Sequence, residues 1–329
     1  MTADDLPLLQ LLMAHEGSRL SVAEGAAEGD PLGHAAELML DDLYVVPRDA
    51  ALAPLALGSA PEGFAVATGG ALGTPGHPLH LDALLTFMEP GGGTITAILL
   101  VETDPSGHLE ETFLVALAAL PPETPLQLIG IDRDGGAPAL AAIGAASFAV
   151  GTRIAMADGH QVPVEALRPG DRVLTRDDGP QPVLWTGKAI RRATGPFAPI
   201  TLRAGALGNA ADLVLSPSHR LFVYQRSDRV DAGRPDLLVR AADLVNRRDV
   251  LRTEGGFVEW VQLLFERHQI VYAEGIAAES LLLDPATEAA LPADLERPEH
   301  DAPDGLDLTG TATGMPDLAA RLRAASRGD

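Results

Sequence analysis

The feature of this sequence that most constrains its fold is the repeated alternation of short apolar runs with turn-forming residues. Glycine occurs 34 times and proline 26 times in 329 residues, and both gather in clusters. Such clusters lie at Glu89–Gly93, Asp104–Gly107, Pro169–Asp171, Asp177–Pro180 and Gly205–Asn209. Because Gly, Pro, Asp and Asn favour tight turns, the pattern indicates many short elements rather than a helical bundle. We therefore predict an all-β chain.

The N-terminal region contains the clearest predicted strands. They lie at Thr94–Thr103 and Thr112–Leu120, and Ser106-Gly107 between them is typical of a hairpin turn. Ala35–Leu43 is interpreted as a short helix. We expect residues 1–140 to form a mainly antiparallel β domain. Nothing in its sequence identifies a ligand or a reaction.

Charge and composition narrow the range of partners. The net charge is −22, from 24 basic and 46 acidic residues, and a surface this acidic repels phosphate backbones. We therefore expect no nucleic-acid partner. The sequence has no cysteine, so disulfides, thiolate catalysis and Cys-based metal sites are excluded. His77 and His80 have a metal-like spacing, but a zinc site would need further ligands, and we predict neither a metal nor a cofactor.

The two ends of the chain carry different signals. The apolar run Leu6–Met13 follows acidic residues, whereas a secretory signal is basic there, and it is too short to span a bilayer. Localisation stays open between the cytoplasm and export without an N-terminal signal, such as type I secretion. After Asp284 the chain is rich in Pro, Glu and Asp, which predicts an acidic, disordered tail over 284–329. Within it, Met315–Ala325 predicts a short amphipathic helix.

Motifs with chemical meaning follow one another between Ala146 and Ser280. They are Ala146–Ile154 (ASFAVGTRI), Val164–Thr175 (VEALRPGDRVLT), Leu215–Leu221 (LSPSHRL) and Arg267–Ile276 (RHQIVYAEGI). In order and spacing they resemble the Hint domain, the self-cleaving module shared by hedgehog proteins and inteins. The residues of these motifs most resemble a bacterial subgroup of Hint-domain proteins.

The resemblance implies an architecture for the second half of the chain. A Hint domain is a flattened, horseshoe-like β structure with approximate two-fold symmetry, whose halves would here be Ser147–Arg192 and Ile200–Ser280. The chain would then divide into an N-terminal β domain of unassigned role (1–140), a Hint domain (146–283) and the tail (284–329).

The resemblance also implies a reaction. In a Hint domain the hydroxyl or thiol of the first residue attacks the preceding carbonyl and converts the peptide into an ester or thioester. Ser147 would attack Ala146, so the chain's own N-terminal segment would be the substrate. His219 would hydrogen-bond the scissile nitrogen and protonate it, Ser216 would orient the carbonyl or the histidine, and His268 would assist proton transfer.

This sequence departs from the family pattern at both ends of the domain. Ser147 stands where most members have Cys, and a hydroxyl is the weaker nucleophile. Glu279 and Ser280 stand where inteins end in His-Asn, so the asparagine cyclisation that completes splicing is not expected. The hedgehog sterol-binding extension has no counterpart after Asp284.

Two functions remain open from the sequence. One is autoproteolysis by an N–O acyl shift at Ala146–Ser147, a single-turnover reaction that releases the N-terminal domain. The other is a catalytically inactive Hint fold that serves as a binding or scaffold module of a secreted or surface-associated bacterial protein. Protein partners are not identified by the sequence.

Overall fold

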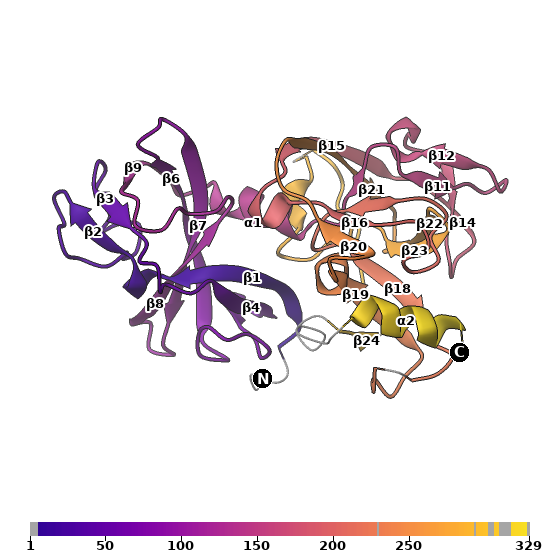
Figure 1. The fold of residues 1–329 in the computed structure, drawn as a ribbon, viewed down its shortest axis with the longest axis horizontal. Helices are drawn as coiled ribbons and strands as arrows, with labels where there is room; N and C mark the ends of the chain where they lie inside the picture. Colours follow the sequence, from indigo (N-terminus) through magenta and orange to yellow (C-terminus); the bar gives the residue numbers. More distant parts are fainter. Residues whose placement is uncertain (1–5, 229, 293, 302–305, 309–316, 328–329) are drawn as a thin grey trace. The chain divides into compact units, whose positions relative to one another are not determined.

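The computed structural model describes residues 6–228, 230–292, 294–301, 306–308 and 317–327. The chain forms two compact units, Met1–Ala142 and Ile143–Asp329 (Figure 1). Regular structure in both units is nearly all β, which confirms the all-β prediction. The two helices predicted from the sequence, at Ala35–Leu43 and Met315–Ala325, are considered below.

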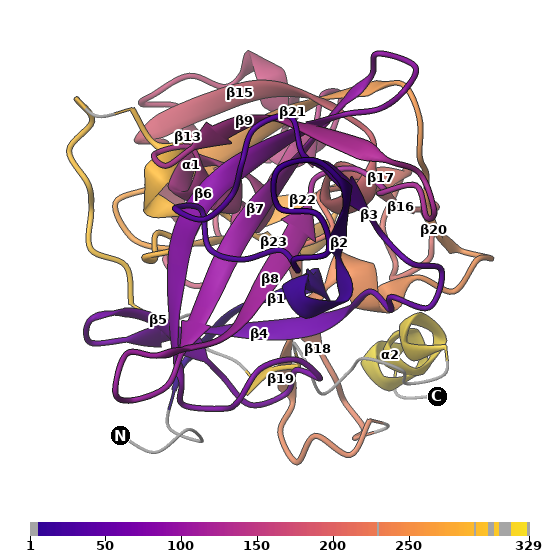
Figure 2. The same ribbon diagram turned by 90° about the vertical axis from the view of Figure 1, so that its left-hand side faces the viewer.

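The first unit is a closed β-barrel with an extension. Strands β6, β5, β4, β1, β8 and β7 pair in that order, and β7 pairs back with β6 to close the ring (Figure 2). Strands β9, β3 and β2 continue the sheet outward from β6. The bounds are β1 Leu8–Glu16, β2 Ser21–Glu24, β3 Leu43–Val45, β4 Ala53–Ala60, β5 Gly63–Val66, β6 Pro78–Met88, β7 Thr94–Thr103, β8 Leu109–Ala116 and β9 Leu126–Asp132.

The predicted hairpin is confirmed. β7 and β8 pair antiparallel from Ala97 with Ala116 to Thr103 with Leu109. The Asp104 carboxylate accepts hydrogen bonds from the backbone N–H groups of Ser106 and His108, and Gly107 takes a φ of 85° that a side chain would disfavour. The turn chemistry read from the sequence is therefore what sets the register of these strands.

The predicted helix at Ala35–Leu43 is wrong. The segment forms turns that lead into β3, and Asp41 has a positive φ of 73°, which an α-helix does not accommodate. Ala35 and Leu38 are buried in the barrel-side core. Packing of isolated apolar side chains thus overrides the weak helical pattern of this stretch.

The second unit follows the helix α1 (Gly136–Gly144) and consists of two larger sheets and a small hairpin. One sheet has the order β15-β21-β10-β17-β16-β20, the other β12-β11-β22-β23-β18-β19-β24, and β13 pairs with β14. The bounds are β10 Phe148–Ala149, β11 Arg153–Ala155, β12 Gln161–Pro163, β13 Arg172–Leu174, β14 Pro180–Pro182, β15 Trp185–Arg192, β16 Ile200–Leu202, β17 Leu213–Leu215, β18 Arg220–Tyr224, β19 Asp236–Arg240, β20 Val250–Arg252, β21 Phe257–Leu264, β22 Ile270–Ala273, β23 Ile276–Glu279 and β24 Leu306–Asp307.

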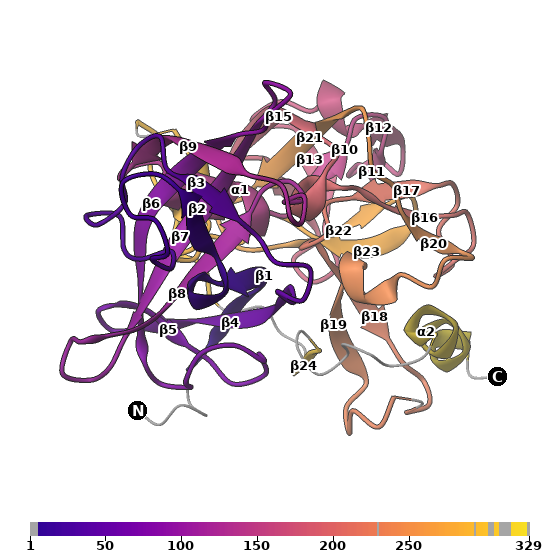
Figure 3. The ribbon, with the colours of Figure 1, turned by 60° about the vertical axis from the view of Figure 1, so that its left-hand side comes forward.

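The two-fold repeat predicted from the resemblance is visible in backbone contacts. Each half has a short strand, then a hairpin (β11–β12 or β18–β19), then a single 3-10 turn. The N–H of Val164 bonds to the Thr152 carbonyl in the first half, and that of Ala241 bonds to the His219 carbonyl in the second. The hairpin β22–β23 lies between β11 and β18 (Figure 3). His219 thus occupies the position in the second half that Thr152 occupies in the first.

The tail is only partly inside the described residues. The structure does not describe residues 293, 302–305, 309–316 and 328–329. The disorder predicted for 284–329 therefore lies outside the described residues at these positions. The described parts pack on the second unit. β24 pairs in parallel with β19, and the helix α2 (Leu318–Arg327) buries Leu318, Ala319, Leu322 and Ala325. Residues 315 and 316 of the predicted helical run lie outside the described residues, and from Leu318 on the run is docked through its apolar face.

Neither α-helix in the described part of the chain has the length and hydrophobicity that crossing a membrane requires. No cluster of three or more His, Asp or Glu side chains suited to a metal ion occurs among those same residues. His77 instead pairs with the buried Glu102, with 2.9 Å between Nδ1 and Oε1. His80 contacts Thr103.

Candidate active site

The peptide between Ala146 and Ser147 lies in the interior of the second unit. The chain leaves α1 at Gly144 and enters β10 at Phe148, and this short connection carries the predicted scissile bond. Ala145, Ala146 and Ser147 are exposed by only 1%, 4% and 4%. Burial of three consecutive small residues means that water does not reach this bond freely.

The Ser216–His219 turn faces this segment. It connects β17 to β18 and is closed by a hydrogen bond of 3.1 Å from the His219 N–H to the Ser216 carbonyl. Phe148 in β10 pairs with Leu215 in β17, and the Ser216 N–H continues this pairing by donating to the Ser147 carbonyl. The local β pairing therefore holds the turn against Ser147.

Serine hydroxyls contact the nitrogen of the predicted scissile bond and the carbonyl of the preceding peptide. The Ser147 N–H donates to Ser216 Oγ at 3.2 Å, so Ser216 contacts the nitrogen that cleavage would release. The Ala145 carbonyl accepts from Ser216 Oγ at 3.3 Å and from Ser147 Oγ at 3.2 Å. Ser218 Oγ donates to the Ile143 carbonyl at 2.7 Å. The segment before Ser147 is thereby fixed through its main chain.

The predicted contact of His219 with the scissile nitrogen is wrong in this arrangement. Its Nδ1 lies 3.1 Å from the Ser147 carbonyl oxygen, which belongs to the next peptide, and its Nε2 is buried without a hydrogen-bond partner. The reason is that the Ser147 N–H already donates its hydrogen bond to Ser216 Oγ. His219 also packs edge-on against the Phe148 ring, with centroids 4.5 Å apart.

The protonation state of His219 follows from its burial. The side chain is inaccessible to solvent, and this burial lowers its pKa to about 4, although the Glu279 charge and the Ser147 carbonyl oppose the shift. At neutral pH the imidazole is therefore uncharged. A neutral ring carries a single N–H, and Nδ1, which faces the Ser147 carbonyl oxygen, is the nitrogen that donates it.

A buried charge network lies beside His219. The Arg220 guanidinium donates through Nε and through one terminal nitrogen to Glu279 Oε2 at 2.9 and 2.7 Å, and through the other to Asp307 at 2.7 Å. The Arg220 N–H also donates to Glu279 Oε1. Burial alone would raise the Glu279 pKa, but the Arg220 charge and the hydrogen bonds from His268 and Arg220 outweigh it and lower that pKa to about 2.

His268 belongs to this network rather than to the scissile peptide. Its Nε2 lies 3.5 Å from Glu279 Oε2, and both side chains are about as buried as Ser147, at 5% and 4% exposure. No contact between His268 and Ser147 or Ala146 is present in the described structure. The structure thus brings Ser147, Ser216 and His219 together, while His268 reaches them only through Glu279.

Some residues of the site were not predicted as part of it. Ser218 and Arg220 flank His219 in the sequence, so the motif itself was the available signal for them. Glu279 was noted only as a departure from the intein pattern. Asp307 comes from β24 in the tail, and no sequence feature connects it to Arg220.

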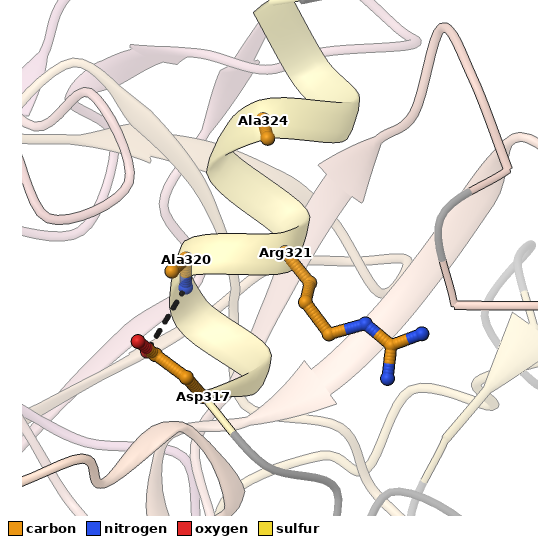
Figure 4. Close-up of a pocket in the computed structure, with 4 residues that line it drawn as sticks. All are labelled: Asp317, Ala320, Arg321 and Ala324. Carbon is orange, nitrogen blue, oxygen red and sulfur yellow. Dashed lines mark hydrogen bonds between the residues drawn. The ribbon is translucent and has the colours of Figure 1, made fainter.

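A separate shallow depression lies on α2. It is lined by Asp317, Ala320, Arg321 and Ala324, and none of the predicted site residues contributes to it (Figure 4). Asp317 caps the start of the helix by accepting a hydrogen bond from the Ala320 N–H. These contacts are those of a surface helix terminus.

Comparison with known proteins agrees with the sequence motifs. The sequence model of the Hint domain family matches residues 146–285, which confirms the resemblance predicted for this part of the chain. No sequence among the curated proteins matches the chain.

Among solved structures, three inteins are similar to part of the chain. The Ssp DnaB mini-intein variant M86 is 16% identical, with 42% of this chain and 97% of that chain covered and a TM-score of 0.30. The gp41-1 intein is 10% identical, with 40% and 97% covered and a TM-score of 0.25. The MchDnaB-1 intein is 14% identical, with 40% and 98% covered and a TM-score of 0.28.

Proposed function

Because residues 146–285 match the Hint domain family, we propose that this chain cleaves itself once, at the bond between Ala146 and Ser147. Its own N-terminal segment is the substrate, and the N-terminal unit is the part cut from the chain. The observation that carries the proposal is the Ser216 hydroxyl on the scissile nitrogen, 3.2 Å away, inside a site closed to solvent. The reaction is single-turnover because the nucleophile is part of the substrate.

The proposed chemistry has two stages. Ser147 Oγ loses its proton and bonds to the Ala146 carbonyl carbon, the C–N bond breaks, and the Ser147 nitrogen takes up a proton to become a free amine. Water then attacks the resulting ester at the same carbon. The bond to Oγ breaks, the Ser147 hydroxyl regains a proton, and Ala146 ends in a carboxylate.

In this proposal the described arrangement precedes the reaction. The Ser147 hydroxyl points to the Ala145 carbonyl and must rotate about χ1 to reach Ala146. His219 must shift its Nδ1 from the Ser147 oxygen to the Ser147 nitrogen, two atoms of one residue. Since both movements precede bond making, we expect slow cleavage.

The proposal stops at one cut. Completion of splicing needs an asparagine amide that attacks its own backbone carbonyl, and Glu279 and Ser280 carry no amide. The Glu279 carboxylate is held by Arg220, and the Ser280 hydroxyl accepts a hydrogen bond from the Gln269 N–H at 2.9 Å. Both side chains are thus committed to structural contacts.

A second candidate function has an observation of its own. His219 contacts the carbonyl after Ser147 instead of the scissile nitrogen, and the Ser147 hydroxyl is engaged by the Ala145 carbonyl. An inactive Hint fold that serves as a binding or scaffold module would keep such an arrangement permanently. The two candidates differ in whether the chain is ever cut.

The deciding experiment is mass spectrometry of the purified full chain during long incubation at neutral and mildly alkaline pH, with and without hydroxylamine. Hydroxylamine attacks esters, so it accelerates cleavage if the acyl shift occurs. We expect fragments that end at Ala146 and begin at Ser147. A chain that stays intact under all these conditions supports the inactive module instead.

A further inference from the structure

The segment Ile143–Ala146, which comprises the end of α1 and the bend after it, is held by hydrogen bonds from one turn of the second unit. Carbonyls of alternate residues, Ile143, Ala145 and Ser147, accept from Ser218 Oγ, Ser216 Oγ and His219 Nδ1. All three donors come from the Ser216–His219 turn. Because each of these hydrogen bonds goes to the main chain, they fix the register of the segment and do not depend on the identity of its side chains.

The side chain of Ala145 lies in one enclosed apolar subsite. The Ala145 methyl group is 1% exposed and belongs to a separate small apolar cluster with Leu264, Leu281 and Leu291, which are 0%, 1% and 6% exposed. Protein interiors are close-packed, so additional carbon atoms at Ala145 need room that these leucines already fill.

Part of this subsite comes from outside the family match. Leu291 follows residue 285, where the match ends, and Leu295 packs against the same cluster. A 3-10 turn at Glu288–Ala290 precedes Leu291 and brings the chain back toward the body of the unit. The segment after the Hint match therefore supplies a wall of the subsite.

We propose that this site selects a small side chain two residues before Ser147, and that Leu291 is a specificity-determining residue. The substrate class is a peptide that leaves a helix end through a bend and carries Ala, Gly or Ser at the bend position. The specificity concerns the bond that the proposed cleavage would break and in that respect rests on the proposed function. Docking of the segment is measurable whether or not the bond is cut.

The test is a size exchange in the full chain. The variants are Ala145→Leu, Leu291→Ala and the double variant, with Ala137→Leu as a matched control because Ala137 is exposed on the same connecting helix. Docking is read from amide hydrogen exchange of peptides that span residues 143–148, and the first unit serves as the internal reference for folding. Cleavage is followed in parallel by mass spectrometry.

We expect Ala145→Leu to speed exchange in this peptide by about tenfold or more, because the Ser147 N–H leaves Ser216. The double variant should recover most of the protection, since it exchanges a leucine and an alanine within one cluster and conserves volume. General destabilisation would not be reversed by a second core truncation. Ala137→Leu should exchange like the wild type.

The outcomes separate the two proposals. Wild-type protection in Ala145→Leu, or a double variant no better protected than Ala145→Leu, overturns the subsite. An intact wild-type chain overturns the cleavage proposal, and the hydrogen-exchange result still tests the subsite. If Ala145→Leu does not fold, Ala145→Val compared with Ala145→Ser gives the same contrast, with protection expected only for serine.

Discussion

Ser216 Oγ lies 3.2 Å from the amide nitrogen of Ser147 and accepts its hydrogen bond. The same hydroxyl donates to the Ala145 carbonyl, so one side chain connects the two peptide groups that flank Ala146. The peptide that the proposed reaction would break is therefore held by a residue that was predicted only to orient its surroundings. His219, predicted for this contact, lies one carbonyl further along the chain.

Substitution of Ser147 tests the nucleophile. Ser147→Ala should abolish cleavage, because no other atom of that residue can attack Ala146. Ser147→Cys should cleave faster and become sensitive to dithiothreitol, since a thiol ionises more readily than a hydroxyl. Intact mass measurement over time checks both. Ser106→Ala, at an exposed turn of the first unit, is the control and should match the wild type.

Substitution of Ser216 tests the bridge that its hydroxyl forms between the Ser147 N–H and the Ala145 carbonyl. Ser216→Ala should lower the unfolding free energy of the second unit by about 1–3 kcal/mol, because it leaves the buried Ser147 N–H without a partner. Ser216→Thr retains the hydroxyl and should lose less. Both tryptophans, Trp185 and Trp260, lie in the second unit, so tryptophan fluorescence in urea reports on it selectively. Equal losses for both variants would contradict the bridge.

Acidification should weaken the second unit through His219. Its folded pKa of about 4 lies below its ordinary value of 6.5, so the unfolded state binds the extra proton first. Stability is therefore lost as pH falls from 6.5 toward 4, by about 2 kcal/mol between pH 7 and pH 5. His219→Gln should show a smaller loss than the wild type over this interval in urea titrations. His300, whose pKa is also lowered by burial, contributes equally to both proteins and cancels in the comparison.

Removal of charge from the Arg220–Glu279 pair should be costly. Glu279→Gln leaves the buried Arg220 with Asp307 as its remaining carboxylate partner, and we expect a loss of about 3 kcal/mol in unfolding free energy. Arg248→Gln is the matched control. Arg248 is 64% exposed in its ion pairs with Asp249 and Asp317, so its loss should stay below about 1 kcal/mol. Similar losses in the two variants, measured by fluorescence in urea, would count against a buried network.

The docked tail helix should contribute to stability. Leu322 is fully buried in the core of the second unit, so Leu322→Ala should lower its unfolding free energy by about 2–4 kcal/mol. Ile190→Ala, at a residue 65% exposed, should cost less than about 1 kcal/mol. A Leu322→Ala protein with wild-type stability would show that α2 does not pack on this core in solution.

Local turn chemistry explains what could be predicted of the fold. Asp104 and Gly107 determine the hairpin between β7 and β8 by short-range contacts that the sequence displays directly. The closure of β7 onto β6, in contrast, depends on how a whole barrel packs. The helix predicted at Ala35–Leu43 failed for a related reason, because Ala35 and Leu38 are placed by core contacts with distant strands.

In the site, too, the local motif could be predicted from the sequence and the long-range contacts could not. The motif around Ser216 and His219 pointed to the turn that meets Ser147, because a known family supplies that pairing. The hydrogen-bond partner of each atom could not be predicted from the motif, because the same motif is compatible with a contact of His219 to the nitrogen or to the oxygen of Ser147. Asp307 was not readable either, since only the folded tail brings it to Arg220.

The insertion of β22–β23 between β11 and β18 has a consequence for the order of events during synthesis. A ribosome completes the first unit and Ser147 well before it adds Glu279, yet β18 lies between β19 and β23, and Arg220 beside His219 binds Glu279 of β23. Domains that emerge first fold first. The proposed cut therefore waits for the late strands, and the N-terminal unit has finished folding before anything could detach it.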